Sequence, residues 1–157
     1  MKKINWKTLI FCIVIPLLVG AISGFISMNG MKEFASINKP PLSPPGFLFP
    51  IVWTILYILM GISSYLVLTS DASQNDKRNA LIIYGIQLFF NFFWSIFFFN
   101  FELYFFSFFW LLALWILIIL NIIRFNKISK AASYLLIPYL LWVTFAAYLN
   151  LAIAILN

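Results

Sequence analysis

The sequence alternates between long apolar stretches and short polar connections. Each stretch has roughly the 20 mostly apolar residues that a helix needs to cross the hydrocarbon core of a bilayer. None shows the ten-residue alternation of apolar and polar positions that is typical of a β-barrel strand. The pattern therefore predicts an all-α integral membrane bundle of five transmembrane helices, at about residues 8–28, 47–69, 80–99, 103–123 and 131–156.

Residues 29–46 form the one long connection between these predicted helices. The other connections, at roughly 70–79, 100–102 and 124–130, are short. Short connections make neighbouring helices run antiparallel and pack together. Because the chain also shows no internal repeat, we expect residues 1–157 to form a single domain with one long proline-rich loop between the first and second helices.

The composition agrees with a membrane protein. Hydrophobic residues make up 64% of the chain and charged residues 9%, and the mean hydropathy is +1.04. A soluble domain carries about 25% charged residues, which excludes a water-soluble enzyme, a nucleic-acid-binding module and a disordered tail. The single cysteine, Cys12, and the lack of histidine exclude a disulfide framework or a zinc site within one chain. We expect the bilayer as a partner, no nucleic acid, no metal and no required cofactor.

The basic residues are distributed unevenly between the two ends of the predicted helices. Cytoplasmic segments of membrane proteins carry an excess of Lys and Arg. The distribution predicts a cytoplasmic N-terminus and an external C-terminus, in what we expect to be a bacterial plasma membrane. Eight basic residues lie on the predicted cytoplasmic side and two on the other, namely Lys2, Lys3, Lys7, Lys77, Arg78, Arg124, Lys127 and Lys130 against Lys32 and Lys39.

The end of the long loop is rich in proline. Residues 40–45 contain four prolines, which fix their own φ and push the preceding residues toward extended conformations. Such a stiff segment is either a lid with a defined shape or a rigid spacer into the second helix. Ser43 followed by Pro44 also predicts a helix N-cap with proline at the first helical position.

Aromatic and amide residues recur at helical spacing in three of the five predicted helices. Amides inside a membrane need hydrogen-bond partners, so these faces are expected to point into the bundle. Two interpretations remain open, because the faces could line a ligand cavity or the amides could simply join helices while the tryptophans lie at the interface. The positions are Trp53 and Tyr57, then Gln87, Asn91, Trp94, Ser95 and Phe98, then Pro138, Trp142, Ala146, Asn150 and Ala154.

Other positions are expected to contribute little to a site. The fourth predicted helix is apolar all round and shows no amide in mid-span, which favours lipid exposure. Trp6 and Trp110 are expected to face lipid or to lie in the interfacial belt. Gly20 and Gly24 are four residues apart, which permits close helix approach, in a dimer seam or in packing within the chain.

The chemistry that the sequence lacks narrows the function further. No Asp, Glu, Lys or Arg lies in the middle of a predicted span, so a proton-coupled carrier is not favoured. Without histidine, no nucleophile–base arrangement for hydrolysis can be built. Aromatic walls, a few amides and Lys32 or Lys39 at the outer mouth favour a flat apolar ligand with acidic edges.

Three motifs resemble those of the TspO/MBR family, the tryptophan-rich sensory proteins related to the mitochondrial translocator protein. They occur in the order found in that family and cover essentially the whole chain. They are Lys39-Pro40-x-x-x-Pro44-Pro45 with Phe49-Pro50-x-Val52-Trp53-Thr54-x-Leu56-Tyr57, then Asn91-x-x-Trp94-Ser95-x-x-Phe98, and last Pro138-Tyr139-x-x-Trp142-x-x-Phe145-Ala146-x-Tyr148-Leu149-Asn150.

The resemblance implies a five-helix bundle, often a homodimer, that binds porphyrins such as protoporphyrin IX. It implies a pocket among the first, second, third and fifth helices under the first loop, covered by an aromatic residue at Phe34. With Lys39 as the cation at the mouth, the expected ligand-binding residues are Phe34, Lys39, Trp53, Tyr57, Asn91, Trp94, Ser95, Phe98, Trp142, Phe145 and Ala146.

The leading hypothesis is a porphyrin-binding membrane protein with a sensory, stress-regulatory or scavenging role. One alternative that the resemblance implies is light- and oxygen-dependent porphyrin degradation, with Trp53 and Trp142 as the catalytic pair. Others are facilitated transport of tetrapyrroles or other amphiphiles, or a purely structural partner.

The sequence departs from the family pattern at two places. Glu33-Phe34 stands where the family usually has Trp-Tyr, which weakens the expected stacking of the lid on a ligand. No Lys or Arg follows Tyr148, so the cholesterol-recognition pattern of animal relatives is missing and sterol transport is not expected.

Overall fold

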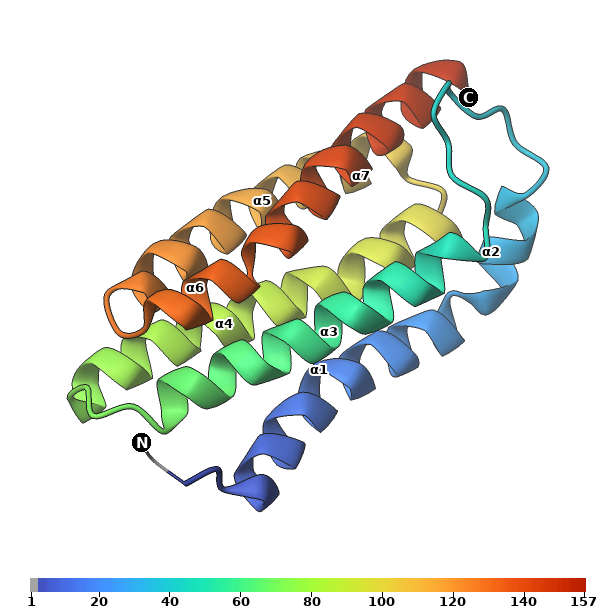
Figure 1. The fold of residues 1–157 in the computed structure, drawn as a ribbon. Coiled ribbons are helices and arrows are strands. Elements are labelled where there is room, and N and C mark those ends of the chain that lie inside the picture. The colour runs from blue at the N-terminus through green and yellow to red at the C-terminus, as the bar shows by residue number, and fades with distance from the viewer. Residues whose placement is uncertain (1–2) are drawn as a thin grey trace.

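The computed structural model describes residues 3–157, and the secondary structure within that range is helical throughout (Figure 1). Lys2, one of the residues behind the predicted orientation, lies outside the described residues. Five helical segments are long and apolar enough to cross a membrane, as predicted. The elements are α1 (Trp6–Ile26), α2 (Met28–Phe34), α3 (Leu48–Leu68), α4 (Gln74–Ser95), the π-helix η1 (Ile96–Asn100), α5 (Tyr104–Asn126), α6 (Lys130–Leu135) and α7 (Ile137–Leu156).

Side-chain caps set the beginnings of three helices. The side-chain oxygen of Asn5 accepts a hydrogen bond from the Thr8 amide at 3.2 Å, which begins α1. The Ser73 hydroxyl accepts one from the Asp76 amide at 3.1 Å, so α4 begins several residues before the predicted position at 80. Ser129 caps α6 in the same way. Such caps satisfy amide groups that have no partner within the helix.

The first half of the long connection is helical, which the sequence did not predict. The short helix α2 packs against η1, where a side-chain Cβ at Gly30 would overlap the carbonyl group of Phe99. Phe34, at the end of α2, packs its ring against Phe98 and Phe99 with centroids 5.7 and 5.4 Å apart. Tertiary packing on η1 therefore stabilises a helix whose own sequence signal is weak.

The predicted N-cap at Ser43 is wrong, because α3 begins only at Leu48. The Ser43 hydroxyl instead donates to the carbonyl oxygen of Pro40 at 2.8 Å, within a turn in which Leu42 has a φ of 71°. Pro44 precedes another proline, and a residue in that position is disfavoured in the helical conformation. Pro44 is therefore kept out of the helix, and α3 begins after Pro45.

The fifth predicted helix is broken at Leu136 into α6 and α7. Pro138 lies in the first turn of α7, where backbone amides have no acceptor within the helix. Its missing amide hydrogen therefore costs no intrahelical hydrogen bond. The break lets α6 pack against α3, while α7 packs against α5 (Figure 1). As a result α3 and α7 lack the extensive contact that α3 makes with α6.

The tightly packed core lies in the half of the bundle away from the α2–α3 connection. Its centre is formed by residues with no exposed surface, among them Met60, Val67, Leu111, Leu114, Ile118, Phe125 and Leu136. Several of them belong to one face of α5. The fourth predicted helix is therefore a core element on that face, although its opposite face carries exposed apolar side chains such as Phe109 and Ile116.

Two residues of α5 bear on the expectations for this helix. Asn121 is a buried amide, but it lies near the end of the span and not in mid-span, where no amide was expected. Trp110, expected to face lipid or lie in the interfacial belt, is half-buried; its indole N–H donates to the Phe90 carbonyl oxygen at 2.8 Å and its ring stacks on Phe90. Trp6, in contrast, has 63% of its surface exposed.

A candidate ligand cavity under the first loop

A cavity of about 790 Å³ lies in the half of the bundle beneath the α2–α3 connection. Its walls come from α1, α3, α4 and α7, and its roof from the end of α2 and residues 35–46. Pockets for small molecules typically measure about 300–1,000 Å³ and are lined mainly by apolar and aromatic side chains. The cavity is large enough for a ligand of that class.

Ten of the eleven predicted site residues line this cavity. They come from four separate parts of the chain, which the fold brings together as the resemblance implied. They are Phe34, Lys39, Trp53, Tyr57, Asn91, Trp94, Ser95, Phe98, Trp142 and Ala146.

Phe145 is the exception, since it lines a separate groove on the outside of the bundle between α3 and α7. The inward face of α7 continues through Ala146, Leu149 and Asn150. Successive helical residues are rotated by about 100°, which places Phe145 roughly 80° from the middle of that face. Phe145 was predicted from the resemblance and does not belong to the stripe of positions four apart that includes Trp142, Ala146 and Asn150.

Two aromatic pairs give the cavity flat walls. Trp53 stacks on Tyr57 in α3, with ring centroids 5.6 Å apart and an angle of 28° between the planes. Trp94 in α4 stacks on Phe98 in η1, at 5.3 Å and 23°. Such offset-stacked pairs present wide apolar faces to a neighbouring ring.

A chain of hydrogen bonds fixes the inner end of the cavity. Tyr57 donates its hydroxyl hydrogen to the Asn91 side-chain oxygen at 2.7 Å, and the Asn91 amide nitrogen donates to the Tyr139 hydroxyl at 2.8 Å. Tyr139 in turn donates to the Gln87 side-chain oxygen at 2.7 Å. Asn91 therefore joins α3, α4 and α7 and also lines the cavity, while a ligand in that cavity stays a prediction.

Tyr139 was not among the predicted site residues. It is fully buried beneath the cavity and its ring packs edge-on against Trp53, with centroids 6.2 Å apart. The available signal was its place three residues before Trp142, on the same side of the helix. A buried tyrosine also needs a partner for its hydroxyl group, and the predicted amides of the third helix could have supplied it.

Asn150 holds the opposite wall in place. The Trp94 indole N–H donates to the Asn150 side-chain oxygen at 3.0 Å. The Asn150 amide nitrogen donates to the Tyr104 carbonyl oxygen at 2.8 Å, and the Ser107 hydroxyl donates to the Asn150 oxygen at 3.3 Å. Through these bonds α5 supports the site, contrary to the expectation that the fourth predicted helix contributes little.

Of the two glycines of α1, Gly20 serves close packing within the chain itself. A Cβ at Gly20 would overlap the ring of Tyr57, so this glycine allows the ring to pack against the α1 backbone. Gly24 has open space in the same direction, and both glycines line the cavity. Nearby, the Ser95 hydroxyl contacts those of Ser23 and Ser27. This supports packing within the chain, while the homodimer stays a prediction.

Lys39 is the one charged residue among the described residues that line the cavity. Its ammonium group donates to the Ala35 carbonyl oxygen at 3.1 Å and lies 5.1 Å from the centroid of the Phe34 ring. Both contacts are to uncharged groups, so they do not neutralise the ammonium group. Lys39 therefore brings a positive charge to the mouth of the cavity. Lys32, the other candidate for this role, does not line the cavity.

The roof is tied to the end of α7 by hydrogen bonds that the sequence did not indicate. The Tyr148 hydroxyl donates to the Pro41 carbonyl oxygen at 2.8 Å. The Asn157 side chain makes two bonds to the backbone of Asn38, donating at 2.9 Å and accepting at 3.3 Å. The proline-rich segment is therefore a fixed cover over the cavity as well as a connection into α3.

Comparison with known proteins gives a consistent result over nearly the whole chain. The model of the TspO/MBR family matches residues 12–156. A tryptophan-rich protein TspO of Chlorobaculum tepidum is 40% identical over 151 residues, which cover 96% of each chain. One from Archaeoglobus fulgidus is 37% identical over 154 residues, covering 98% of this chain and 99% of the relative. The translocator protein of Ovis aries is 32% identical over 127 residues, covering 80% and 75% of the two chains.

Proposed function

The chain belongs to the TspO/MBR family of membrane proteins, and on this premise we propose that it binds porphyrins such as protoporphyrin IX in the cavity under the α2–α3 connection. The observation that carries the proposal is the cavity of about 790 Å³ with stacked aromatic pairs in its walls. A sensory, stress-regulatory or scavenging role would follow from such binding.

The shape and chemistry of the walls support a flat apolar ligand. The Trp53–Tyr57 and Trp94–Phe98 pairs come from different helices and both line the cavity. An aromatic macrocycle gains contact area and stacking energy against such faces. The Tyr57 hydroxyl and the Asn91 side chain are hydrogen-bonded to each other. An apolar ring can therefore cover them while this hydrogen bond is kept.

Lys39 would bind the acidic edge of the ligand. Its ammonium group lies at the mouth and contacts a carbonyl oxygen and an aromatic ring. A carboxylate would offer it a charge-assisted hydrogen bond, which is stronger than the bond to an uncharged carbonyl. The ligand would then lie with its carboxylates toward the roof and its apolar rings toward the Asn91 network.

Two glycines allow a direct test of this proposal. Gly24 lines the cavity and Gly85 lies on an exposed part of α4, and both have open space around an added Cβ. We expect Gly24→Leu to weaken protoporphyrin IX binding strongly, because the new side chain occupies the cavity, whereas Gly85→Leu binds as the wild type does. The measurement is quenching of tryptophan fluorescence during titration of the purified protein. Equal binding by both variants would argue against this cavity as the binding site.

A second candidate function is light- and oxygen-dependent degradation of the bound porphyrin. It is favoured by one observation, that Trp53 and Trp142, the indole pair that the resemblance implicates, line the same cavity, together with Trp94. It predicts that illumination in air removes the porphyrin absorbance, and that Trp53→Phe or Trp142→Phe abolishes this loss while binding is retained. Equal bleaching of free porphyrin in detergent would contradict an enzymatic role.

A further inference from the structure

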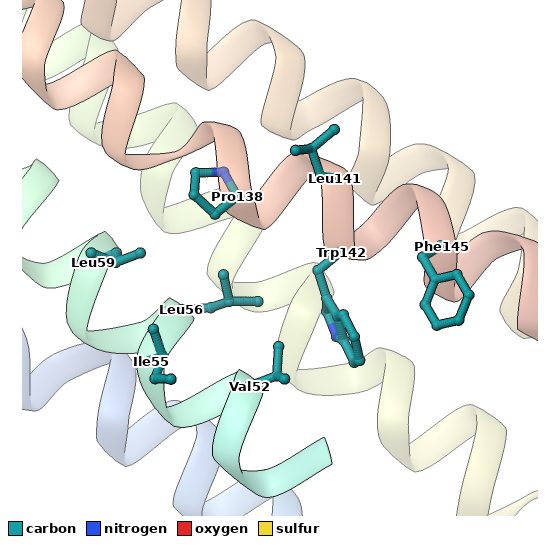
Figure 2. A pocket seen from close by; sticks show the side chains of 8 residues that line it. All are labelled: Val52, Ile55, Leu56, Leu59, Pro138, Leu141, Trp142 and Phe145. Carbon is teal, nitrogen blue, oxygen red and sulfur yellow. The ribbon is translucent and has the colours of Figure 1, made fainter. Parts of the chain in front are cut away.

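A second apolar hollow lies on the outside of the bundle, directly behind the cavity wall. This groove of about 530 Å³ runs between α3 and α7 (Figure 2). Apart from the Trp142 indole nitrogen, its lining side chains are entirely hydrocarbon. They are Val52, Ile55, Leu56 and Leu59 from α3 and Pro138, Leu141, Trp142 and Phe145 from α7.

The position of the groove places it in contact with lipid. Both helices are membrane-spanning segments, and Ile55 and Leu141 on its two sides are 53% and 65% exposed. The groove exists because the break at Leu136 directs α6 against α3, leaving α7 without a comparable contact to α3 beyond Pro138. Hydrocarbon chains of the bilayer therefore reach this seam.

Trp142 separates the groove from the cavity. It is the one residue that lines both hollows, and its side chain extends from α7 into the space beside Val52 of α3 (Figure 2). Its ring contacts the rings of Phe49 and Phe145, with centroids 5.8 and 5.7 Å away. A change in the side-chain torsions of this single residue would join the two spaces.

The indole of Trp142 is held differently from three other indoles of the bundle. Trp94, Trp110 and Trp115 each donate an indole hydrogen bond, at 3.0, 2.8 and 2.8 Å. The Trp142 nitrogen is buried and has no partner among the described residues. A buried indole N–H is usually hydrogen-bonded. Rotation of Trp142 therefore breaks aromatic contacts but no hydrogen bond.

From these observations we infer that the α3–α7 groove is a lateral entrance to the cavity and that Trp142 is its gate. The ligand class is a flat apolar or amphiphilic molecule dissolved in the bilayer, which reaches the cavity through the hydrocarbon region without passing the proline-rich roof. The inference rests on the proposed function, because it names the route to the same cavity. It adds a role for the side of α3 and α7 that faces lipid.

The experiment obstructs the groove without touching the cavity. Ile55→Trp and, from the other side, Leu141→Trp place a bulky side chain at groove positions that do not line the cavity. Ile116→Trp is the matched control, because Ile116 is 54% exposed on α5 and lines neither hollow. Each protein is placed in a lipid nanodisc, and binding and release of protoporphyrin IX are followed by stopped-flow absorbance.

A blocked entrance slows entry and exit by the same factor, so the equilibrium constant is preserved. We expect both groove variants to show association and dissociation rates about tenfold lower, with a Kd equal to that of the wild type, while Ile116→Trp is unchanged. Wild-type rates in the groove variants would contradict the lateral entrance but not the proposed binding site. A weaker Kd with an unchanged association rate would have the same meaning. Absence of saturable binding by the wild type would overturn both proposals.

Discussion

The two halves of the bundle are built from the same helices but differ in how they fill the space between them. Away from the α2–α3 connection, side chains such as Met60, Leu114 and Phe125 leave no exposed surface. Beneath the connection, Gly20, Gly24 and other small residues of α1 and α7 leave the space open, and the aromatic rings stand at its walls. Both side-chain size and helix path therefore decide which half is hollow. Small residues leave space beneath the connection, and the break at Leu136 keeps α7 from packing closely against α3 there.

The boundary between the halves is a layer of hydrogen bonds. Tyr57, Asn91, Tyr139 and Gln87 link α3, α4 and α7 at the inner end of the cavity. Below this layer the packed core begins, so the cavity is closed at that end. Buried polar networks fix the helices around them when every member has a partner, which lets the walls of an open space keep their positions.

The largest expected effect is in the solid half. Phe125→Ala removes a fully buried ring from the core, and such deletions lower the free energy of unfolding by about 3–5 kcal/mol. We expect a clearly lower melting temperature in detergent but an unchanged Kd for protoporphyrin IX in the folded fraction. Phe109→Ala, at a residue of α5 that is 64% exposed, is the control and should leave the melting temperature unchanged. A weakened Kd with normal stability in Phe125→Ala would mean that the halves are not separate.

A smaller effect is expected where the hollow half contacts α1. In Gly20→Ala the new methyl group overlaps the Tyr57 ring, which is tied to Asn91 and cannot move without stretching that bond. Overpacking of this kind costs about 1–3 kcal/mol. Gly24→Ala, one turn away in open space, should be neutral or slightly stabilising. Thermal unfolding of the two variants measures the difference, and equal melting temperatures would contradict the close packing of Gly20.

The smallest expected effect concerns charge at the mouth. Lys39→Gln removes the positive charge from the cavity wall, and because Lys39 is exposed, the loss is about 0.2–1 kcal/mol, or at most about fivefold in Kd for a porphyrin with carboxylates. Lys32→Gln, at an exposed residue of α2 outside the cavity, should bind as the wild type does. Titrations at low and high salt measure both, since added salt should reduce the gap. An identical Kd for the two variants would exclude Lys39 as the anchor.

The five spans could be predicted from the sequence because hydropathy over 20 residues is a local property. The ten cavity residues that the prediction included follow from local spacing and from the resemblance to a family. Trp53 and Tyr57 are four residues apart, as are Trp94 and Phe98, so each pair occupies one helix face. These are relations within one helix, and a sequence displays them directly.

The features that the sequence did not indicate depend on contacts between distant segments. Helix α2 requires Gly30 to lie against Phe99, and the roof requires Tyr148 and Asn157 to reach residues more than 100 positions earlier. Neither residue type nor spacing encodes such pairings in a form that can be read without the fold. Phe145 is a different case, because it entered the predicted site through the resemblance, and helical rotation alone places it off the inward face of α7.

A structure of this protein with protoporphyrin IX bound would locate the binding site directly. We expect the macrocycle inside the hollow half, with its faces toward Trp53 and Trp94, its carboxylates beside Lys39 and the Tyr57–Asn91 bond intact. A porphyrin bound on the lipid-facing surface, with the cavity collapsed or filled by side chains, would exclude this cavity as the binding site.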